Sequence, residues 1–213
     1  MATAAKHSAY YGEVGGGSLY LLSLEGLSEA ELLARAALGA EDAVRYAAFP
    51  PEAEQRRREW LGARVLVREV LGGEVGYNPD GRPRLVGGTV PCHISISHTR
   101  GWVALLTADT PCGIDIELSD RSAERVARRI AAPDELTLAA ELFPENPALL
   151  IWCAKEAAYK AIGRPNLDFL CDIQLQATSA RSLLITIQPN VIRLQFTLAK
   201  NLICVGGSVK RSK

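Results

Sequence analysis

The sequence predicts an α+β fold made of two comparable halves. The first observation is the order of the expected elements: a strand, a helix, a hairpin and further strands, followed by helices and a second run of strands. The second is the β-branched, alternating character of the C-terminal part, which is typical of an antiparallel meander. The third is the size, since 213 residues with 48% hydrophobic and 23% charged side chains suit one large domain or two small joined ones. We place the joint near 109–111, giving halves 1–109 and 110–213.

The first half begins with a strand and a capped helix. Residues Ser18–Leu24 are expected to form a buried strand. Ser28 and Glu31 have the spacing of a capping box, which predicts a short helix over 29–37. The glycine-rich segment 12–18 precedes the strand and does not link a strand to a helix, so we interpret it as a flexible lead-in and not as a phosphate loop.

A long helix follows, with Pro50-Pro51 at its start and Gly72-Gly73 at its end. The turn residues within Tyr77–Leu85 then predict a short hairpin. Strands are expected at His93–Ser97, Trp102–Ala108 and Gly113–Leu118, and near Cys171–Ala177, Leu183–Gln188, Val191–Leu198 and Leu202–Val209. Helices are expected at Ser122–Ala131, Pro133–Leu142 and Pro147–Ile162. The last helix has the clearest limits, because Asn146 is a good N-cap and Gly163 a good C-terminal stop.

Composition and charge narrow the class of protein. Lys and Arg together number 24, as do Asp and Glu, so the formal net charge is zero. Binding of long nucleic acid needs a basic excess; we therefore expect no nucleic-acid partner, and any anionic ligand must meet a local cluster of cations. The five cysteines show no CxxC spacing and predict neither a zinc site nor a disulfide framework. No signal peptide or membrane-spanning run is found, so we expect a cytoplasmic protein without membrane contact.

Two acidic side chains share one face of an expected strand. In Gly113–Glu117 the side chains alternate, so Asp115 and Glu117 point away from Ile114 and Ile116. Such a pair of oxygen ligands suits Mg²⁺. A half-exposed strand with a solvated acidic face would have the same sequence pattern.

The expected helix at 147–162 carries a second cluster. Trp152, Glu156 and Lys160 lie on one stripe at helical period, with Lys155 beside it. An ordinary Glu156–Lys160 ion pair would explain the spacing, but the surrounding sequence is largely apolar, which concentrates these charges.

Four further residues could meet an anion, and each also has an ordinary interpretation. Arg82 ends a tight turn and could be a surface arginine. Ser97 and His98 close an alternating strand, and no catalytic triad follows from their spacing. Arg58 lies beside the buried stripe of the long helix, where a guanidinium needs a carboxylate or a phosphate.

Together these motifs resemble the 4′-phosphopantetheinyl transferase superfamily, in particular its surfactin-synthetase-activator (Sfp) type. The matching segments are GRP at 81–83, ISISHTRGWVALL at 94–106, GIDIE at 113–117 and WCAKEAAYKAIG at 152–163, with 56–71 similar to the family's first long helix. The resemblance implies two pseudo-twofold-related α+β halves with the active site in the cleft between them. It also implies Mg²⁺-dependent transfer of the 4′-phosphopantetheine arm of coenzyme A to a serine of an apo carrier protein (acyl, peptidyl or aryl), releasing adenosine 3′,5′-bisphosphate.

The resemblance also implies roles for individual residues. Asp115, Glu117 and Glu156 would bind Mg²⁺, and Glu156 or a metal-held water would take the proton from the carrier serine. Lys160 would neutralise the leaving phosphate. Contacts to the phosphates of coenzyme A would come from Arg58, Arg82, Ser97, His98 and Lys155.

Other functions fit parts of the same pattern. One is a coenzyme A or carrier-protein binding module without catalysis, and another is a Mg²⁺-dependent hydrolase of the coenzyme A pyrophosphate. We expect a monomer, because one chain contains both halves of the expected site.

Overall fold

The computed structural model describes residues 8–179 and 181–209. The helices in this part of the chain are α1 (Glu29–Ala36), α2 (Ala40–Ala47), α3 (Glu54–Leu71), α4 (Glu124–Ile130), α5 (Pro133–Leu142) and α6 (Pro147–Ile162). The strands are β1 (Ser8–Val14), β2 (Gly17–Ser23), β3 (Gly73–Tyr77), β4 (Pro83–Gly87), β5 (His93–Thr99), β6 (Trp102–Ala108), β7 (Cys112–Leu118), β8 (Gln174–Ser179), β9 (Ser182–Ile187), β10 (Asn190–Ala199) and β11 (Leu202–Val209).

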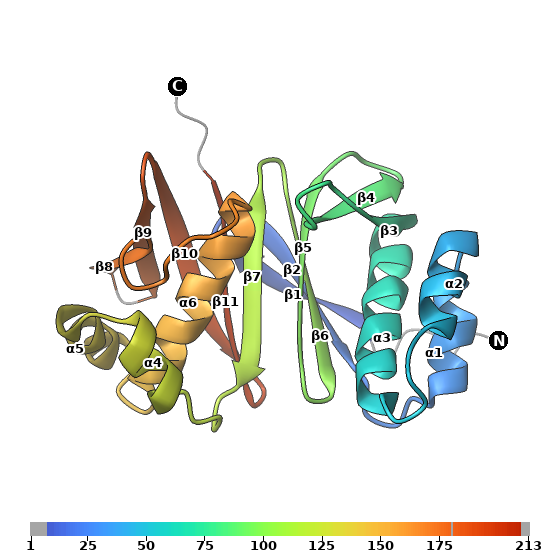
Figure 1. Cartoon of the computed structure of the whole chain (residues 1–213), viewed down its shortest axis with the longest axis horizontal. Coiled ribbons are helices and arrows are strands. Elements are labelled where there is room, and N and C mark those ends of the chain that lie inside the picture. Colours follow the sequence, from blue (N-terminus) through green and yellow to red (C-terminus); the bar gives the residue numbers. More distant parts are fainter. Residues whose placement is uncertain (1–7, 180, 210–213) are drawn as a thin grey trace.

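Two antiparallel sheets lie between two layers of helices (Figure 1). The strand orders are β1-β2-β6-β5 and β7-β11-β10-β9-β8, and β3 and β4 form a separate hairpin. The helix α3 packs on the first sheet, with α1 against α3; α6 packs on the second sheet, with α4 and α5 against α6. Apolar side chains of both sheets, such as Leu19, Leu106, Ile114 and Cys204, meet in a central core. The predicted α+β class is confirmed.

The two halves repeat one arrangement. In the first half β2 leads through α3 to the hairpin β5–β6, and β6 pairs with both β2 and β5. In the second half β7 leads through α6 to the hairpin β10–β11, and β11 pairs with both β7 and β10. The chain passes from one sheet to the other between Ala108 and Cys112. The division into 1–109 and 110–213 as domains stays a prediction.

Local sequence signals place most elements correctly. Ser28 and Glu31 form the predicted capping box at the start of α1. The helix α6 has the predicted limits, with the Asn146 side chain accepting from Leu149 N and Gly163 following its end. Within the described residues, no helix is long and apolar enough to cross a bilayer.

The interpretation of segment 12–18 as a flexible lead-in is wrong. These residues form the end of β1 and its tight turn into β2. The turn packs against β11: Gly15 O accepts from Ser208 N at 3.1 Å, and a Cβ on Gly15 would lie 2.4 Å from Gly206 O. Gly15 also has φ +57, which favours glycine. The glycines therefore let the hairpin of one half contact the sheet of the other.

Another glycine brings α6 close to β7. A Cβ on Gly113 would lie 1.9 Å from Ala157 O and 2.7 Å from Ala161 N. Only a residue without a side chain allows the helix backbone to lie this near the strand. Because Glu156 and Lys160 neighbour this contact point in α6, Gly113 determines how closely they approach the acidic face of β7.

Candidate active site

The two halves meet along the edge strands β5 and β7, where serine side chains join them. Ile114 N donates to Ser95 Oγ at 3.1 Å, and Ile116 N donates to Ser97 Oγ at 3.2 Å. The residue numbers increase along both strands from the first contact to the second, so β5 and β7 run parallel. We call this junction the seam. It places the Gly113–Glu117 motif beside the Ser95–His98 motif, which lies in the other half.

Asp115 lies at the middle of the seam. Its Oδ1 accepts hydrogen bonds from Ser97 Oγ at 2.9 Å and from Lys160 Nζ at 2.7 Å. Its Oδ2 is buried and has no hydrogen-bond partner among the described residues. The thiol of Cys153 is nearby, but thiols are weak donors. A buried oxygen without a partner destabilises a protein by about 1–3 kcal/mol, so its presence needs an explanation such as a bound ion.

Glu156 lies close to Asp115. Burial raises the pKa of the Glu156 carboxyl above its ordinary 4.5; the positive charge of Lys160 opposes this shift, and the negative charge of Asp115 adds to it. No described side chain forms a hydrogen bond or an ion pair with Glu156. Two partly unsatisfied carboxylates therefore share one environment.

Glu117 points the same way from β7 but is occupied by other groups. It is 6% exposed, accepts from Thr99 Oγ1 at 2.7 Å, and forms an ion pair with Arg121. In residues 8–179 and 181–209, no three His, Cys, Asp or Glu side chains gather closely enough to hold a metal ion. The predicted three-carboxylate site is therefore not assembled in this structure.

The chemistry of the remaining pair fits Mg²⁺. This ion is commonly held by one or two carboxylates together with substrate phosphates and waters. Asp115 offers the unpartnered Oδ2, and Glu156 offers a carboxylate without a competing partner. These two residues could hold the ion, and Glu117 could join only by leaving Arg121.

Two hollows open along the seam, one on either side of the Ser97–Asp115 contact. The upper cleft, of about 360 Å³, is lined among others by Arg82, Ser95, Cys112, Tyr159, Lys160 and Gly163. The lower cleft, of about 550 Å³, is lined among others by Glu59, His98, Thr99, Arg100, Glu117 and Arg121. Because each strand of the seam lines both clefts, Asp115 lies between them.

Two of the predicted phosphate-binding residues line these clefts. Arg82 lines the upper cleft, pairs with Asp80 at 2.8 Å and donates to Ile162 O at 3.4 Å. His98 lines the lower cleft, with Nδ1 3.1 Å from Glu59 Oε2. They occupy different clefts, so they would meet different parts of one extended ligand.

Ser97 and Lys155 are not placed to bind phosphate. The Ser97 hydroxyl is buried and donates to Asp115, which orients that carboxylate. Lys155 is fully buried, and its Nζ donates to Glu135 Oε2 at 2.8 Å, Ile130 O at 2.7 Å and Phe169 O at 2.8 Å. All three donors of Lys155 are used inside the second half, so these contacts do not support its predicted phosphate contact.

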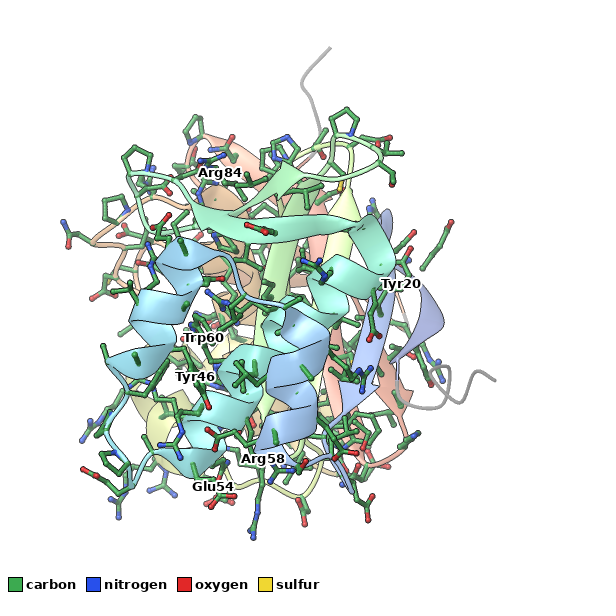
Figure 2. All side chains as sticks on the ribbon, turned by 90° about the vertical axis from the view of Figure 1, so that its right-hand side faces the viewer. Tyr20, Tyr46, Glu54, Arg58, Trp60 and Arg84 are labelled. Carbon is green, nitrogen blue, oxygen red and sulfur yellow. The ribbon has the colours of Figure 1, made fainter. Side chains whose placement is uncertain are left out.

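Arg58 is also placed away from the seam. Its Nη2 donates to Leu24 O and to Leu27 O, both at 2.8 Å, while its buried Nε has no partner in the described part of the chain. Figure 2 shows Arg58 near the lower end of the helical face, at the opposite end from Arg84 of β4. Arg58 lines neither cleft. Arg58 of α3 therefore holds the loop between β2 and α1, and these contacts do not support its predicted phosphate contact.

Sequence reasoning missed three residues at the lower cleft: Glu59, Thr99 and Arg121. Arg121 follows Glu117 by four residues, but this spacing has no fixed meaning outside a helix. Glu59 lies in the predicted long helix, where its spacing alone does not show that it faces a cleft. Thr99 follows His98 at the end of the strand and gave no chemical signal of its own.

Comparison with known proteins found one family model that matches part of the chain. Residues 111–207 match the model of the 4′-phosphopantetheinyl transferase superfamily. No curated protein sequence matches the chain. Among the solved structures that match is the holo-[acyl-carrier-protein] synthase of Thermotoga maritima, with 17% identity, a TM-score of 0.41, and coverage of 49% of this chain and 65% of that chain. The segment similar to the 4′-phosphopantetheinyl transferase superfamily is thus the second half, which carries Asp115, Glu117, Glu156 and Lys160.

Proposed function

We propose that this protein transfers the 4′-phosphopantetheine arm of coenzyme A to a serine of an apo carrier protein, as an Sfp-type transferase that uses Mg²⁺. The observation that carries the proposal is that two carboxylates lie close together beside Lys160. Asp115 has a buried Oδ2 without a partner among the described residues, and Glu156 forms no hydrogen bond or ion pair with them. The superfamily match over residues 111–207 supports the same chemistry.

The reaction breaks one phosphorus–oxygen bond and forms another. The serine Oγ attacks the phosphorus that bears the pantetheine arm, and the bond from this phosphorus to the bridging oxygen breaks. Adenosine 3′,5′-bisphosphate leaves with that oxygen. When Mg²⁺ is bound, the chemistry that it supplies is neutralisation of the pyrophosphate charge.

The side chains supply the proton transfer and the remaining charge. Glu156 receives the serine proton, directly or through a water. Lys160 is 29% exposed and lines the upper cleft, so its ammonium can meet the charge on the departing oxygen. Ser97 keeps Asp115 in place.

Incubation with coenzyme A, Mg²⁺ and a panel of apo carrier proteins tests the proposal by mass spectrometry. We expect at least one carrier to gain one phosphopantetheine arm, and Asp115→Ala and Glu156→Gln to abolish the gain. The exposed Glu145 supplies the matched control, Glu145→Gln, which should retain activity.

Two results would replace the proposal. Binding of coenzyme A without modification of any carrier would indicate a binding module. Release of adenosine 3′,5′-bisphosphate without a carrier would indicate a pyrophosphate hydrolase.

A further inference from the structure

Glu59 of α3 is a buried carboxylate at the lower cleft. It is 7% exposed; its Oε1 accepts from Gln55 Nε2 at 2.9 Å, and its Oε2 lies 3.1 Å from His98 Nδ1. The neighbouring Arg57 pairs with another acid, and Arg58 donates to backbone carbonyls. His98 is therefore the only basic group in the described part of the chain that pairs with Glu59. A buried carboxylate needs such a partner.

The contact determines how His98 faces the cleft. The His98 side chain is 54% exposed, and its Nδ1 lies 3.1 Å from Glu59 Oε2. The opposite ring nitrogen, Nε2, has no partner among the described residues. An imidazolium donates from both nitrogens, so His98 can donate Nδ1–H to Glu59 and Nε2–H to an anion in the cleft. A carboxylate behind a histidine commonly sets the orientation of the ring in this way.

We propose that Glu59 is a positioning residue, which holds the His98 ring so that Nε2–H is available to a phosphate of coenzyme A. The inference rests on the proposed function, because coenzyme A supplies the anion. Glu59 lies behind His98 and does not touch the ligand. The other charged groups that line this cleft are Arg100, Glu117, Asp120 and Arg121, of which Glu117 and Arg121 pair with each other.

A double-mutant cycle tests the inference. Adenosine 3′,5′-bisphosphate binding is measured by calorimetry, and KM and kcat are measured with coenzyme A and a carrier, for Glu59→Gln, His98→Ala and the double variant. Glu59→Gln should raise Kd and KM about tenfold, which corresponds to about 1.4 kcal/mol, and leave kcat unchanged. In the His98→Ala background it should add no further loss. Glu54→Gln, an exposed acid of the same helix, is the matched control.

If Glu59→Gln weakens nucleotide binding equally in the wild-type and His98→Ala backgrounds, its role is purely structural and the inference is overturned. An unchanged Kd in Glu59→Gln would also overturn it. A second measurement needs no variant: the ¹⁵N spectrum of the wild-type complex with adenosine 3′,5′-bisphosphate should show both His98 nitrogens protonated, and a singly protonated ring would contradict the inference. Nucleotide binding is measured without a carrier. A protein that binds the nucleotide but modifies no carrier therefore overturns the proposed transfer and leaves the role of Glu59 open to the same test.

Discussion

Gly113→Ala should show how strongly the site depends on the contact between α6 and β7. The added Cβ would lie 1.9 Å from Ala157 O and 2.7 Å from Ala161 N, both in helix backbone that cannot rotate away. Overpacking of this kind destabilises proteins by about 1–3 kcal/mol. At about 2–4 °C per kcal/mol for a chain of this size, the melting temperature should fall by roughly 2–12 °C.

The same substitution should reduce activity more than stability. To relieve the overlap, α6 must move away from β7 and carry Glu156 and Lys160 with it. A displacement of about 1 Å can lower a rate about 100-fold. Calorimetry and the carrier assay measure the two effects. The control is Gly39→Ala, whose Cβ would meet first the flexible end of Glu74 at 3.1 Å. A Gly113→Ala protein with wild-type melting temperature and activity would refute the reasoning.

Three other changes have defined outcomes. Lys155→Met should lower the free energy of unfolding by about 3–5 kcal/mol, because Glu135 keeps a buried charge, and adding Glu135→Gln should restore part of it; denaturant titration measures both. Because burial raises the pKa of Glu156, its ionisation destabilises the fold as pH rises above the ordinary value of 4.5. In the absence of metal, Glu156→Gln should therefore have a higher melting temperature than wild type at pH 8 and the same melting temperature near pH 4. A lower melting temperature of the variant at pH 8 would contradict this. Of the thiols, exposed Cys171 should react first with a thiol reagent and buried Cys153 only on unfolding, and rapid Cys153 labelling would show that α6 opens.

The parts of the fold that follow from sequence are those with local causes. Asn146, Pro147 and Gly163 determine the ends of α6 by satisfying backbone groups within a few residues, so its limits were predicted correctly. The β1–β2 hairpin has no such local signal. Its glycines are required by contact with β11, almost 200 positions later. A glycine-rich sequence of this kind is also typical of flexible segments.

The site shows the same limit. Lys155 and Lys160 both lie in the motif, but five residues place them about 140° apart around a helix, so they face different surroundings. The sequence alone was therefore enough to show that Lys155 and Lys160 do not contact the same phosphate. The partner of Lys155 could not have been found in this way, because Glu135 comes from another helix and is held by Leu175 N and Ala132 N as well.

A protein with zero net charge can bind a polyanion through local cations, even when these cations are paired with acids before the ligand binds. Along the seam three acids each have a basic partner: Asp115 has Lys160, Glu117 has Arg121, and Glu59 has His98. On the proposed function, the phosphates of coenzyme A compete for the cations, and Mg²⁺ competes for the carboxylates of β7. Each ligand releases groups that the other needs, so the two should bind cooperatively, and Mg²⁺ should bind weakly to the protein without coenzyme A.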